Sequence, residues 1–299
     1  MSALRLRDHT LAWARGRPLL MGIVNAGPDS FSDAVRLSTL ESRLAYARRL
    51  VADGADIIDV GGESGVTYTP ASAPDVEIER VVPLVERLAA EGVAVSVDTW
   101  KPAVAAASVA AGAALINDTS GLRDMAMAEL CARSGAGLLV MHTRAAPKEV
   151  RFADYGGDVA GDVVRFLAER RTAALAAGVP ADRLVLDPGP DFAKTPAETV
   201  EVLRATDRLH DLGHPLLLAV SRKYFLGAIT GRPPAERLAS TLAAVGWAAD
   251  AGAAIVRVHD VAEAADFLRV RRVLAGEEEV APFDEDDEDL KWIRVRSTP

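Results

Sequence analysis

The stretch VAVSVDTWKPAVAAASVAAGAALIND (93–118) contains one complete strand–helix–strand unit. A β-branched apolar run ends at Asp98, an alanine-rich segment opens at Pro102, and Gly112 precedes a second apolar run that ends at Asn117. Proline suits the first turn of a helix, and glycine suits the left-handed residue just past its last turn. The stretch therefore predicts two parallel strands joined by a helix.

The same unit recurs along the chain. We expect strands at 19–24, 56–60, 93–97, 113–116, 137–141, 184–186, 215–220 and 254–258. We expect helices at 40–53, 75–91, 102–111, 125–134, 158–177, 196–212, 234–251 and 261–274. Eight alternating units in about 260 residues favour the α/β class and a closed (β/α)8 TIM barrel as a single domain. An open, doubly wound sheet is the alternative.

Composition and the distribution of charge restrict the kind of protein. Hydrophobic residues make up 49% of the 299 residues and charged residues 26%, which is typical of a globular chain. Nine acidic residues lie within 277–289, a stretch without Lys or Arg, and they equal the net charge of −9. We therefore divide the chain into an N-terminal segment (1–18), a barrel (19–275) and an acidic C-terminal tail (276–299). The tail argues against a nucleic-acid partner, because phosphates would be repelled.

The sequence carries no pattern typical of membrane insertion, secretion or thiol chemistry. No apolar run approaches the roughly 18 residues of a membrane span, and no signal peptide is recognisable, so we expect a cytoplasmic protein with no membrane partner. Cys131 is the one cysteine in the sequence, which excludes an intrachain disulfide. The five histidines include no ligand-spaced pair, which argues against a zinc site.

Polar side chains follow every predicted strand. In a barrel of this kind, the residues that carry chemistry gather where the strands end. The acidic and amide side chains can match the donors and acceptors of a pterin or purine-like ring, and the cations can neutralise phosphate or pyrophosphate. Each side chain could instead cap the helix that follows it. The residues at these positions are Asn25, Asp29, Asp59, Asp98, Asn117, His142, Asp187, Ser221, Lys223, Arg257 and His259.

The order and spacing of these strand-end motifs resemble those of dihydropteroate synthase, a pterin-binding barrel family of folate biosynthesis. The likeness runs from residue 19 to about residue 274. It implies a transferase that joins 6-hydroxymethyl-dihydropterin pyrophosphate to p-aminobenzoate and releases pyrophosphate, with a Mg²⁺ cofactor and a homodimeric assembly. The segments that carry it are MGIVNAGPDSFSD (21–33), GADIIDVGGES (54–64), SVDTW (96–100), INDTSG (116–121), LDPGPDFAKT (186–195), SRKYFLG (221–227) and VRVHD (256–260).

The resemblance assigns the pterin contacts and the catalytic residues. It implies that Asp98, Asp187 and Lys223 are catalytic, and that these three residues and Asn117 contact the pterin. Carboxylates around the ring would favour the positive charge that develops on the pterin methylene.

The resemblance also assigns the pyrophosphate site. Asn25, Arg257 and His259 would hold the pyrophosphate, with Asn25 also near the Mg²⁺ ion. Cationic and metal groups at this place would stabilise the negative charge that builds on the leaving group.

The remaining assignments concern the first loop and the amine pocket. Asp29 and Phe31 would lie in a loop that closes over the site, and closure would keep water from the electrophile. Phe192, with Lys223, would form a wall of the aminobenzoate pocket, and Ser221 belongs to the expected substrate-binding set.

The chain departs from the family pattern where p-aminobenzoate is expected to bind. After Gly-Gly-Glu-Ser (61–64) the family continues Thr-Arg-Pro-Gly, whereas this chain has GVTY (65–68). Pro190 and Asp191 stand where the family has an apolar residue and glycine, and an inward carboxylate at 191 would disfavour a carboxylated amine. Two alternatives follow. One is a pterin-binding paralogue with no synthase turnover or with a different amine acceptor, and the other is a barrel of the corrinoid-dependent methyltransferase type.

Overall fold

The computed structural model describes residues 2–27, 38–63, 70–149 and 151–280. Its strands are β1 (Ser2–Leu6), β2 (His9–Trp13), β3 (Leu19–Asn25), β4 (Ile57–Gly61), β5 (Val95–Asp98), β6 (Leu115–Asp118), β7 (Gly137–Met141), β8 (Leu184–Asp187), β9 (Leu217–Leu218) and β10 (Ile255–Val258). Its α-helices are α1 (Leu40–Ala52), α2 (Pro74–Ala90), α3 (Pro102–Ala110), α4 (Ala126–Ser134), α5 (Val159–Ala176), α6 (Pro196–Arg204), α7 (Thr206–His210), α8 (Tyr224–Thr230), α9 (Leu238–Asp250) and α10 (Val261–Leu274). Short 3-10 turns occur at η1 (Ala181–Arg183) and η2 (Pro234–Glu236). Across these described ranges, no helix combines the length and apolar character needed to cross a membrane.

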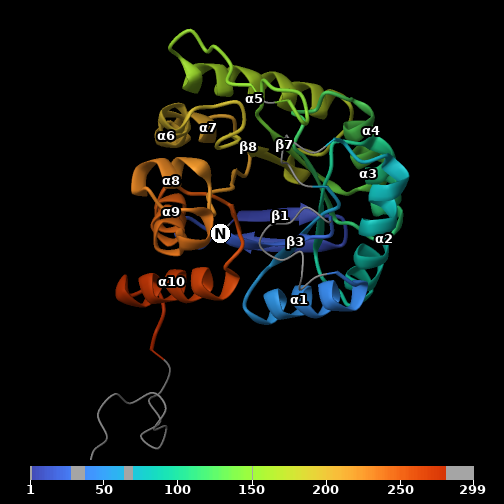
Figure 1. Cartoon of the computed structure of the whole chain (residues 1–299), viewed down its shortest axis with the longest axis horizontal. Helices are drawn as coiled ribbons and strands as arrows, with labels where there is room; N and C mark the ends of the chain where they lie inside the picture. The colour runs from blue at the N-terminus through green and yellow to red at the C-terminus, as the bar shows by residue number, and fades with distance from the viewer. Residues whose placement is uncertain (1, 28–37, 64–69, 150, 281–299) are drawn as a thin grey trace, which may run out of the picture.

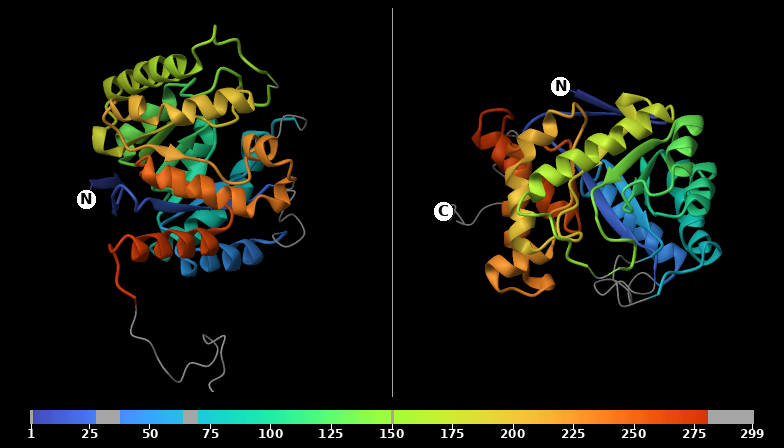
Figure 2. Two further views of the ribbon diagram at one scale, coloured as in Figure 1. Left: turned by 90° about the vertical axis from the view of Figure 1, so that its left-hand side faces the viewer. Right: turned by 90° about the horizontal axis from the view of Figure 1, so that it is seen from above.

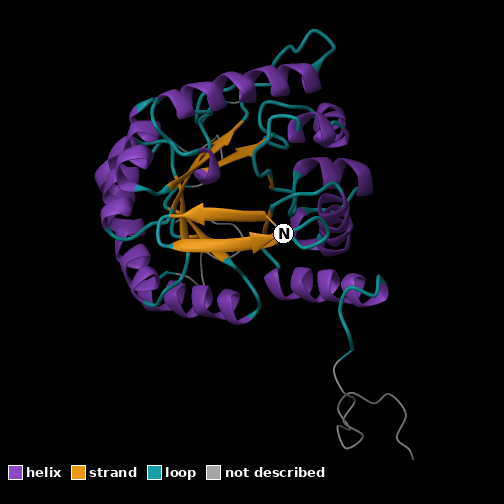
Figure 3. Cartoon of the chain, turned by 180° about the vertical axis from the view of Figure 1, so that it is seen from behind, coloured by secondary structure: helices purple, strands orange, loops and turns teal. Residues whose placement is uncertain are grey.

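The strands from β3 to β10 form a parallel sheet that curves into a barrel, and the helices surround it (Figures 1 and 3). The described part of this sheet has eight strands in the order β8-β7-β6-β5-β4-β3-β10-β9. A parallel bridge between Leu186 and Leu216 brings the two ends of the sheet together. The expected (β/α)8 TIM barrel is therefore confirmed, and the open sheet is excluded.

Local sequence explains where several helices begin and end. Pro102 occupies the first turn of α3, and Thr195 forms a capping box with Glu198 at the start of α6. Gly135 ends α4 with a φ of 76°, a left-handed conformation in which glycine meets no steric penalty. These short-range signals are the reason that most helices lie within a few residues of their predicted positions.

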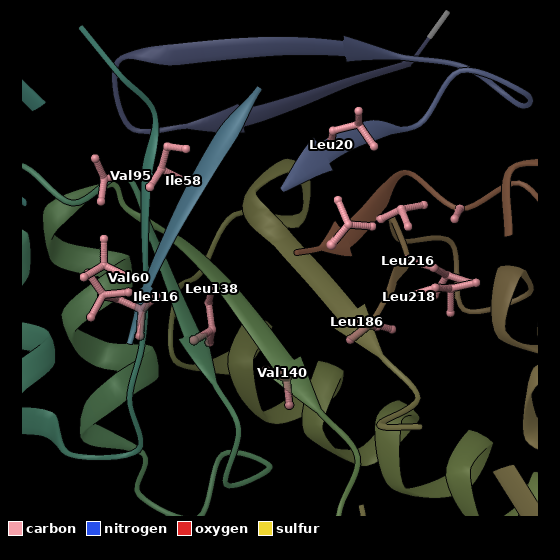
Figure 4. Packing of buried hydrophobic residues seen from close by; sticks show 14 of the residues in the cluster. Leu20, Ile58, Val60, Val95, Ile116, Leu138, Val140, Leu186, Leu216 and Leu218 are labelled. Atoms are coloured by element: carbon pink, nitrogen blue, oxygen red, sulfur yellow. The ribbon is translucent and has the colours of Figure 1, made fainter. Parts of the chain in front are cut away.

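Side chains alternate along each strand between the helix layer and the barrel interior. Leu20, Ile58 and Ile116 face outward and belong to the large apolar core between sheet and helices, which Figure 4 shows from close by. Leu115 and Leu217 belong to a second, smaller core inside the barrel. This alternation decides which strand-end residues can reach the centre of the barrel.

The N-terminal segment is a hairpin that covers one end of the barrel. Strands β1 and β2 pair antiparallel, and the right-hand view of Figure 2 shows them lying across that end. Leu4 and Leu6 are completely buried in the inner core with Leu115, and the Arg7 amide donates to the Gly135 carbonyl at 3.1 Å. Because Leu115 begins β6 and Gly135 lies just before β7, the hairpin covers the amino ends of the strands. Among the described residues, no hairpin of this kind covers the opposite end, where the carboxyl ends of the strands lie.

Two helical regions differ from the sequence-based expectation. The helix expected over 196–212 is divided into α6 and α7 at Ala205, and the helix expected over 234–251 begins as η2 and continues as α9. Helix α8 was not expected, because seven residues give too short a periodic pattern to be recognised. It follows the SRK motif directly and therefore borders the site.

Candidate active site

The last inward positions of the strands form one polar layer at the open end of the barrel. Asn25 of β3 pairs in register with Gly61 of β4, Gly61 with Asp98 of β5, and Asp98 with Asn117 of β6. Parallel strands bring their carboxyl ends to the same edge, so these side chains share one level. The predicted grouping of Asp98 and Asn117 is thereby observed.

Arg257 joins two acidic side chains across this layer. Its Nε lies 2.6 Å from Asp59 Oδ2, and its Nη2 lies 3.3 Å from Asp98 Oδ2. Asn117 Nδ2 donates to the same Asp59 oxygen at 3.3 Å. Asp59 was expected only as a polar residue at a strand end, with no assigned role, although its inward position in the alternation of β4 is a usable signal. The buried Asp59 carboxylate and the partly buried Asp98 carboxylate are tolerated close together because the guanidinium bonds both of them.

Two acceptor atoms in this cluster have no hydrogen-bond partner among the described residues. They are Asp59 Oδ1 and Asn117 Oδ1, both buried. A buried acceptor without a donor costs about 1–3 kcal/mol. Donors of a bound heterocycle would remove that penalty.

Burial changes the proton affinity of the acidic residues here. Burial, and then the neighbouring Asp59 charge, raise the pKa of Asp98 to about 7. Burial raises the pKa of Asp187 to about 6, although the Gly189 amide donates to Asp187 Oδ1 at 2.7 Å. Asp98 therefore changes charge near neutral pH, and Asp187 does so about one unit lower.

Lys223 and Phe192 lie together at the side of the polar layer. Lys223 Nζ is 4.6 Å from the centre of the Phe192 ring and 3.2 Å from the Pro190 carbonyl oxygen. Burial lowers the pKa of Lys223. Both side chains line a cavity of about 310 Å³, to which Asp191 and Trp100 also contribute. Phe192 and Lys223 therefore lie side by side as expected, while their role toward p-aminobenzoate stays a prediction.

Ser221 and His259 form a hydrogen-bonded pair between the last two strands. Ser221 Oγ lies 2.9 Å from His259 Nδ1, and the His259 amide donates to Ser221 Oγ at 3.2 Å. Burial, and then the nearby Arg257 charge, lower the pKa of His259 to about 3. His259 is therefore a neutral imidazole at pH 7.

Comparison with known proteins identifies the family. The model of a family described as pterin binding enzyme matches residues 21–259. A dihydropteroate synthase of Bacillus subtilis is 41% identical over 271 residues, which cover 90% of this chain and 90% of that protein. The chain belongs to the dihydropteroate synthase family of pterin-binding enzymes.

Further relatives show how the family varies. The chain is 42% identical to the Mycobacterium leprae protein named inactive dihydropteroate synthase 2, over 87% of this chain and 90% of that protein. It is 44% identical to a Haloferax volcanii protein named probable bifunctional folylpolyglutamate synthase/dihydropteroate synthase, covering 82% of this chain but 29% of that protein. A solved structure of Xanthomonas albilineans dihydropteroate synthase with 4-aminobenzoic acid has a TM-score of 0.84 and 41% identity, over 92% of this chain and 99% of that one.

Several expected positions of this dihydropteroate synthase family member lie outside the described residues. They are Asp29 and Phe31 in the first loop and the GVTY stretch (65–68) in the second. Their assignments stay predictions.

An ionic cluster that no sequence motif predicted lies at the base of the second loop. Lys101 Nζ lies 2.5 Å from Glu63 Oε2, 2.6 Å from Glu77 Oε2 and 2.7 Å from the Ser72 carbonyl oxygen. Both carboxylates are almost completely buried. Lys101 directly follows SVDTW, but only the fold places Glu63 and Glu77 beside it. The cluster joins β4, α2 and the segment after β5.

His142 stands apart from the polar layer of this family member. It follows the outward positions of β7, and its Nε2 lies 3.1 Å from Asp162 Oδ2 of α5. Its Nδ1 lies 2.8 Å from Lys194 Nζ. The structure therefore separates His142 from His259 and places its ring against Lys194, which lies in the loop after β8.

Proposed function

We propose that this chain is a dihydropteroate synthase, a transferase that joins 6-hydroxymethyl-dihydropterin pyrophosphate to p-aminobenzoate and releases pyrophosphate. The observation that carries this proposal is the buried Asp59–Arg257–Asp98 cluster beside Asn117. It presents charged groups and unpartnered acceptors to a nitrogen heterocycle at the mouth of the barrel. The relatives of that name, at 41% identity, support the same reaction.

Asp98, Asn117 and Asp187 hold the pterin ring in this proposal. Their carboxylate oxygens accept ring N–H groups, and the amide both donates and accepts. Burial raises the pKa of Asp187 to about 6 and that of Asp98 to about 7, so both carboxylates change charge within reach of neutral pH. Positive charge spreads onto the pterin methylene as its C–O bond breaks, and ionised carboxylates stabilise that charge.

Lys223 and Phe192 place the amine beside the pterin. The aromatic ring of p-aminobenzoate packs against Phe192, within the cavity that both residues line. The C–O bond breaks and pyrophosphate leaves with the electron pair of that bond; the amine nitrogen then forms the C–N bond to the methylene and gives up one proton to water or to the departing pyrophosphate. A site that excludes water at this step prevents hydrolysis of the pterin electrophile.

Asn25, Arg257 and His259 receive the pyrophosphate in this proposal. Arg257 also holds Asp59 and Asp98, so part of its charge is already balanced. His259, with a pKa of about 3, contributes a hydrogen bond and not a positive charge at pH 7. Stabilisation of the leaving group therefore needs a further cation.

The donor set suits Mg²⁺ as a partner of the substrate. In the part of the chain that the structure describes, no three His, Cys, Asp or Glu side chains gather in a metal-binding group. Mg²⁺ commonly uses one or two protein oxygens together with substrate phosphates and waters. Asn25, at the end of β3, offers one such oxygen and would hold the ion. When bound, Mg²⁺ neutralises charge on the pyrophosphate.

Homodimeric assembly and a cytoplasmic location belong to the same proposal. Exposed apolar side chains on neighbouring helices α8 and α9 support the dimer: Ile229 is 65% exposed and Trp247 38%. Sedimentation velocity at several protein concentrations tests it, and a monomer at all concentrations would reject it.

A second candidate is a pterin-binding protein that does not use p-aminobenzoate. The observation that favours it is the acidic residue Asp191, which lines the same cavity as Phe192 and Lys223. The relative named as inactive, at 42% identity, also supports it.

One experiment separates the two candidates. The purified full chain is given the dihydropterin pyrophosphate and Mg²⁺, with and without p-aminobenzoate, and pyrophosphate and dihydropteroate are followed by mass spectrometry. A synthase yields both products only when p-aminobenzoate is present. Pterin binding without product supports the second candidate. The variant Asp98→Asn, which keeps the side-chain shape, is the matched control, and turnover equal to wild type in it would exclude this site.

A further inference from the structure

The Asp191 carboxylate is held rigidly at the edge of the cavity. It accepts hydrogen bonds from the amides of Tyr224 at 2.5 Å and Phe225 at 3.2 Å, at the start of α8. The Thr199 hydroxyl donates to it at 3.3 Å. Asp191 has a φ of 67°, a left-handed conformation that Asp adopts more readily than most residues. The side chain therefore has several fixed contacts and one orientation.

Asp191 belongs to the lining of the cavity that holds the proposed amine site, and its carboxylate is bonded to the α8 amides at that edge. Asp191, Phe192 and Lys223 all line it. Burial lowers the pKa of Lys223, and the Asp191 carboxylate is the strongest charge that opposes this effect. Asp191 therefore already compensates the cation nearest to the Phe192 ring.

The other cations on the cavity wall also have acidic partners. Lys148 Nζ lies 3.2 Å from Glu63 Oε1, and Arg151 Nη1 lies 4.0 Å from Glu149 Oε1. Both cations line the cavity, as does Glu149. An entering carboxylate would have to compete with a carboxylate of the chain at each of these three cations. Such competition removes most of the Coulombic gain of binding.

The rest of the wall favours an uncharged aromatic ligand. Trp100, Phe152 and Phe192 contribute rings to the cavity, and Ala145 and Pro147 contribute small apolar surface. A neutral aromatic amine can pack on these groups without losing the solvation of a charged group.

We propose that Asp191 is a specificity-determining residue that makes this site prefer an uncharged aromatic amine to a carboxylated one. The proposal rests on the proposed function for the placement of the amine, and it names the class of amine that this chain uses best. The proposed reaction stays the same: p-aminobenzoate remains a substrate, but a weak one. A fixed negative charge beside the amine site disfavours a second negative charge and leaves a neutral ligand unaffected.

The test compares p-aminobenzoate with 4-aminobenzamide, which has nearly the same shape and no charge. Calorimetry measures the Kd of each for the full chain saturated with Mg²⁺ and the dihydropterin pyrophosphate, or with Mg²⁺ and inorganic pyrophosphate plus a pterin if turnover interferes. We expect the wild type to bind 4-aminobenzamide at least tenfold more tightly than p-aminobenzoate, a difference in binding free energy of about 1.4 kcal/mol. Steady-state kcat/KM for the two amines should show the same preference.

Two variants isolate the charge of Asp191. Asp191→Asn removes the charge but keeps an oxygen that can accept the amide hydrogen bonds, and Asn tolerates positive φ. Asp191→Gly removes the side chain at a φ where glycine is unstrained. Both variants should bind p-aminobenzoate about tenfold more tightly than the wild type does. Their Kd for 4-aminobenzamide should stay within threefold of the wild-type value. Asp158→Asn is the matched control, because Asp158 caps α5 through the Gly161 amide and does not line this cavity.

The outcomes distinguish this inference from the proposed function. Equal wild-type affinity for the two amines, or no change in their ratio in either Asp191 variant, would overturn the role of Asp191. Absence of product with every amine would reject the proposed function, while the Kd ratios would still decide the role of Asp191. An equal change of the ratio in Asp158→Asn would show that the effect is unspecific and would also overturn the inference.

Discussion

Lys194 Nζ lies 2.8 Å from His142 Nδ1 in the interior of the protein, where both side chains are completely buried. The same ammonium group donates to the carbonyl oxygens of Gly189 at 2.9 Å and Phe192 at 3.1 Å, so its three protons all have acceptors. Because Nδ1 accepts, His142 carries its proton on Nε2 and donates to Asp162. Lys194 thus fixes the segment that presents Asp191 and Phe192 to the cavity.

Replacing Lys194 should affect the amine more than the pterin. Lys194→Met leaves two carbonyl oxygens and a ring nitrogen without donors. Each of these groups that no water reaches costs about 1–3 kcal/mol of stability. We expect the KM for the aromatic amine to rise about tenfold and the KM for the dihydropterin pyrophosphate to change less than twofold, in steady-state assays that vary each substrate. Arg133→Met, at an exposed position of α4, is the control. Equal changes in the two KM values would contradict a role in positioning Phe192.

The same lysine should make stability depend on pH above neutrality. Burial lowers the pKa of Lys194 from an ordinary value of 10.5 to about 7. Between these values the unfolded chain binds more protons than the folded one, so the free energy of unfolding rises with pH, by at most about 1.4 kcal/mol per unit. Urea denaturation of wild type and Lys194→Met from pH 6.5 to 10 checks this. The wild type should gain stability relative to the variant across this window, and parallel pH curves would count against the prediction.

Asp98 should control the pH dependence of pterin use. Burial and the Asp59 charge raise its pKa to about 7, and the ionised form is the stronger acceptor for ring donors because both of its oxygens only accept. We expect kcat/KM for the dihydropterin pyrophosphate to fall as pH decreases below about 7, because this parameter reports groups of the free enzyme. Asp98→Asn should lower kcat/KM by about 10–100-fold. The variant should also lose the decrease in kcat/KM near pH 7 and keep the decrease near pH 6 that Asp187 causes. If kcat/KM of the variant still decreased near pH 7, that decrease would belong to a group other than Asp98.

Arg257 should be needed for folding as well as for binding. Arg257→Met leaves the fully buried Asp59 and the partly buried Asp98 without their cation, and removal of one partner from a buried ionic pair costs about 3–5 kcal/mol. Arg257→Lys keeps the charge and should cost less, although it loses the paired geometry. Urea denaturation measures both. Adding Asp59→Asn to Arg257→Met should recover part of the loss, and a double variant less stable than the single one would show that the two residues are not coupled in this way.

The N-terminal hairpin should contribute stability without contributing to catalysis. Leu6 is completely buried in the inner core, and Leu→Ala substitutions at such sites cost about 2–5 kcal/mol. Leu6→Ala should therefore lower the free energy of unfolding by this amount and leave both KM values unchanged, since β1 lies at the opposite end of the barrel. Val270→Ala, at a position 57% exposed, is the control and should change stability by less than about 0.5 kcal/mol. A changed KM in Leu6→Ala would show that the two ends are coupled.

The barrel could be predicted because its signals are local. The strand that ends at Asp98 and the helix that begins at Pro102 are encoded within a few residues, and the unit repeats. Helix α8 could not be predicted in this way, since its seven residues give no clear period. The hairpin was treated as a separate segment, because the burial of Leu4 and Leu6 depends on strands more than a hundred residues away.

The sequence by itself determined which residue types stand at the ends of the strands, and hence that Asp98, Asn117, Asp187 and Arg257 face one another. A period of two along a strand is enough for that, once the strands are parallel. The tertiary structure alone decided the partners. Arg257 meets Asp59 across 198 positions of the chain, and Asp191 meets the Tyr224 amide across 33, through hydrogen bonds that no local pattern contains. Directional contacts of this kind depend on ångström-scale placement by the closed barrel, which is a property of the whole fold.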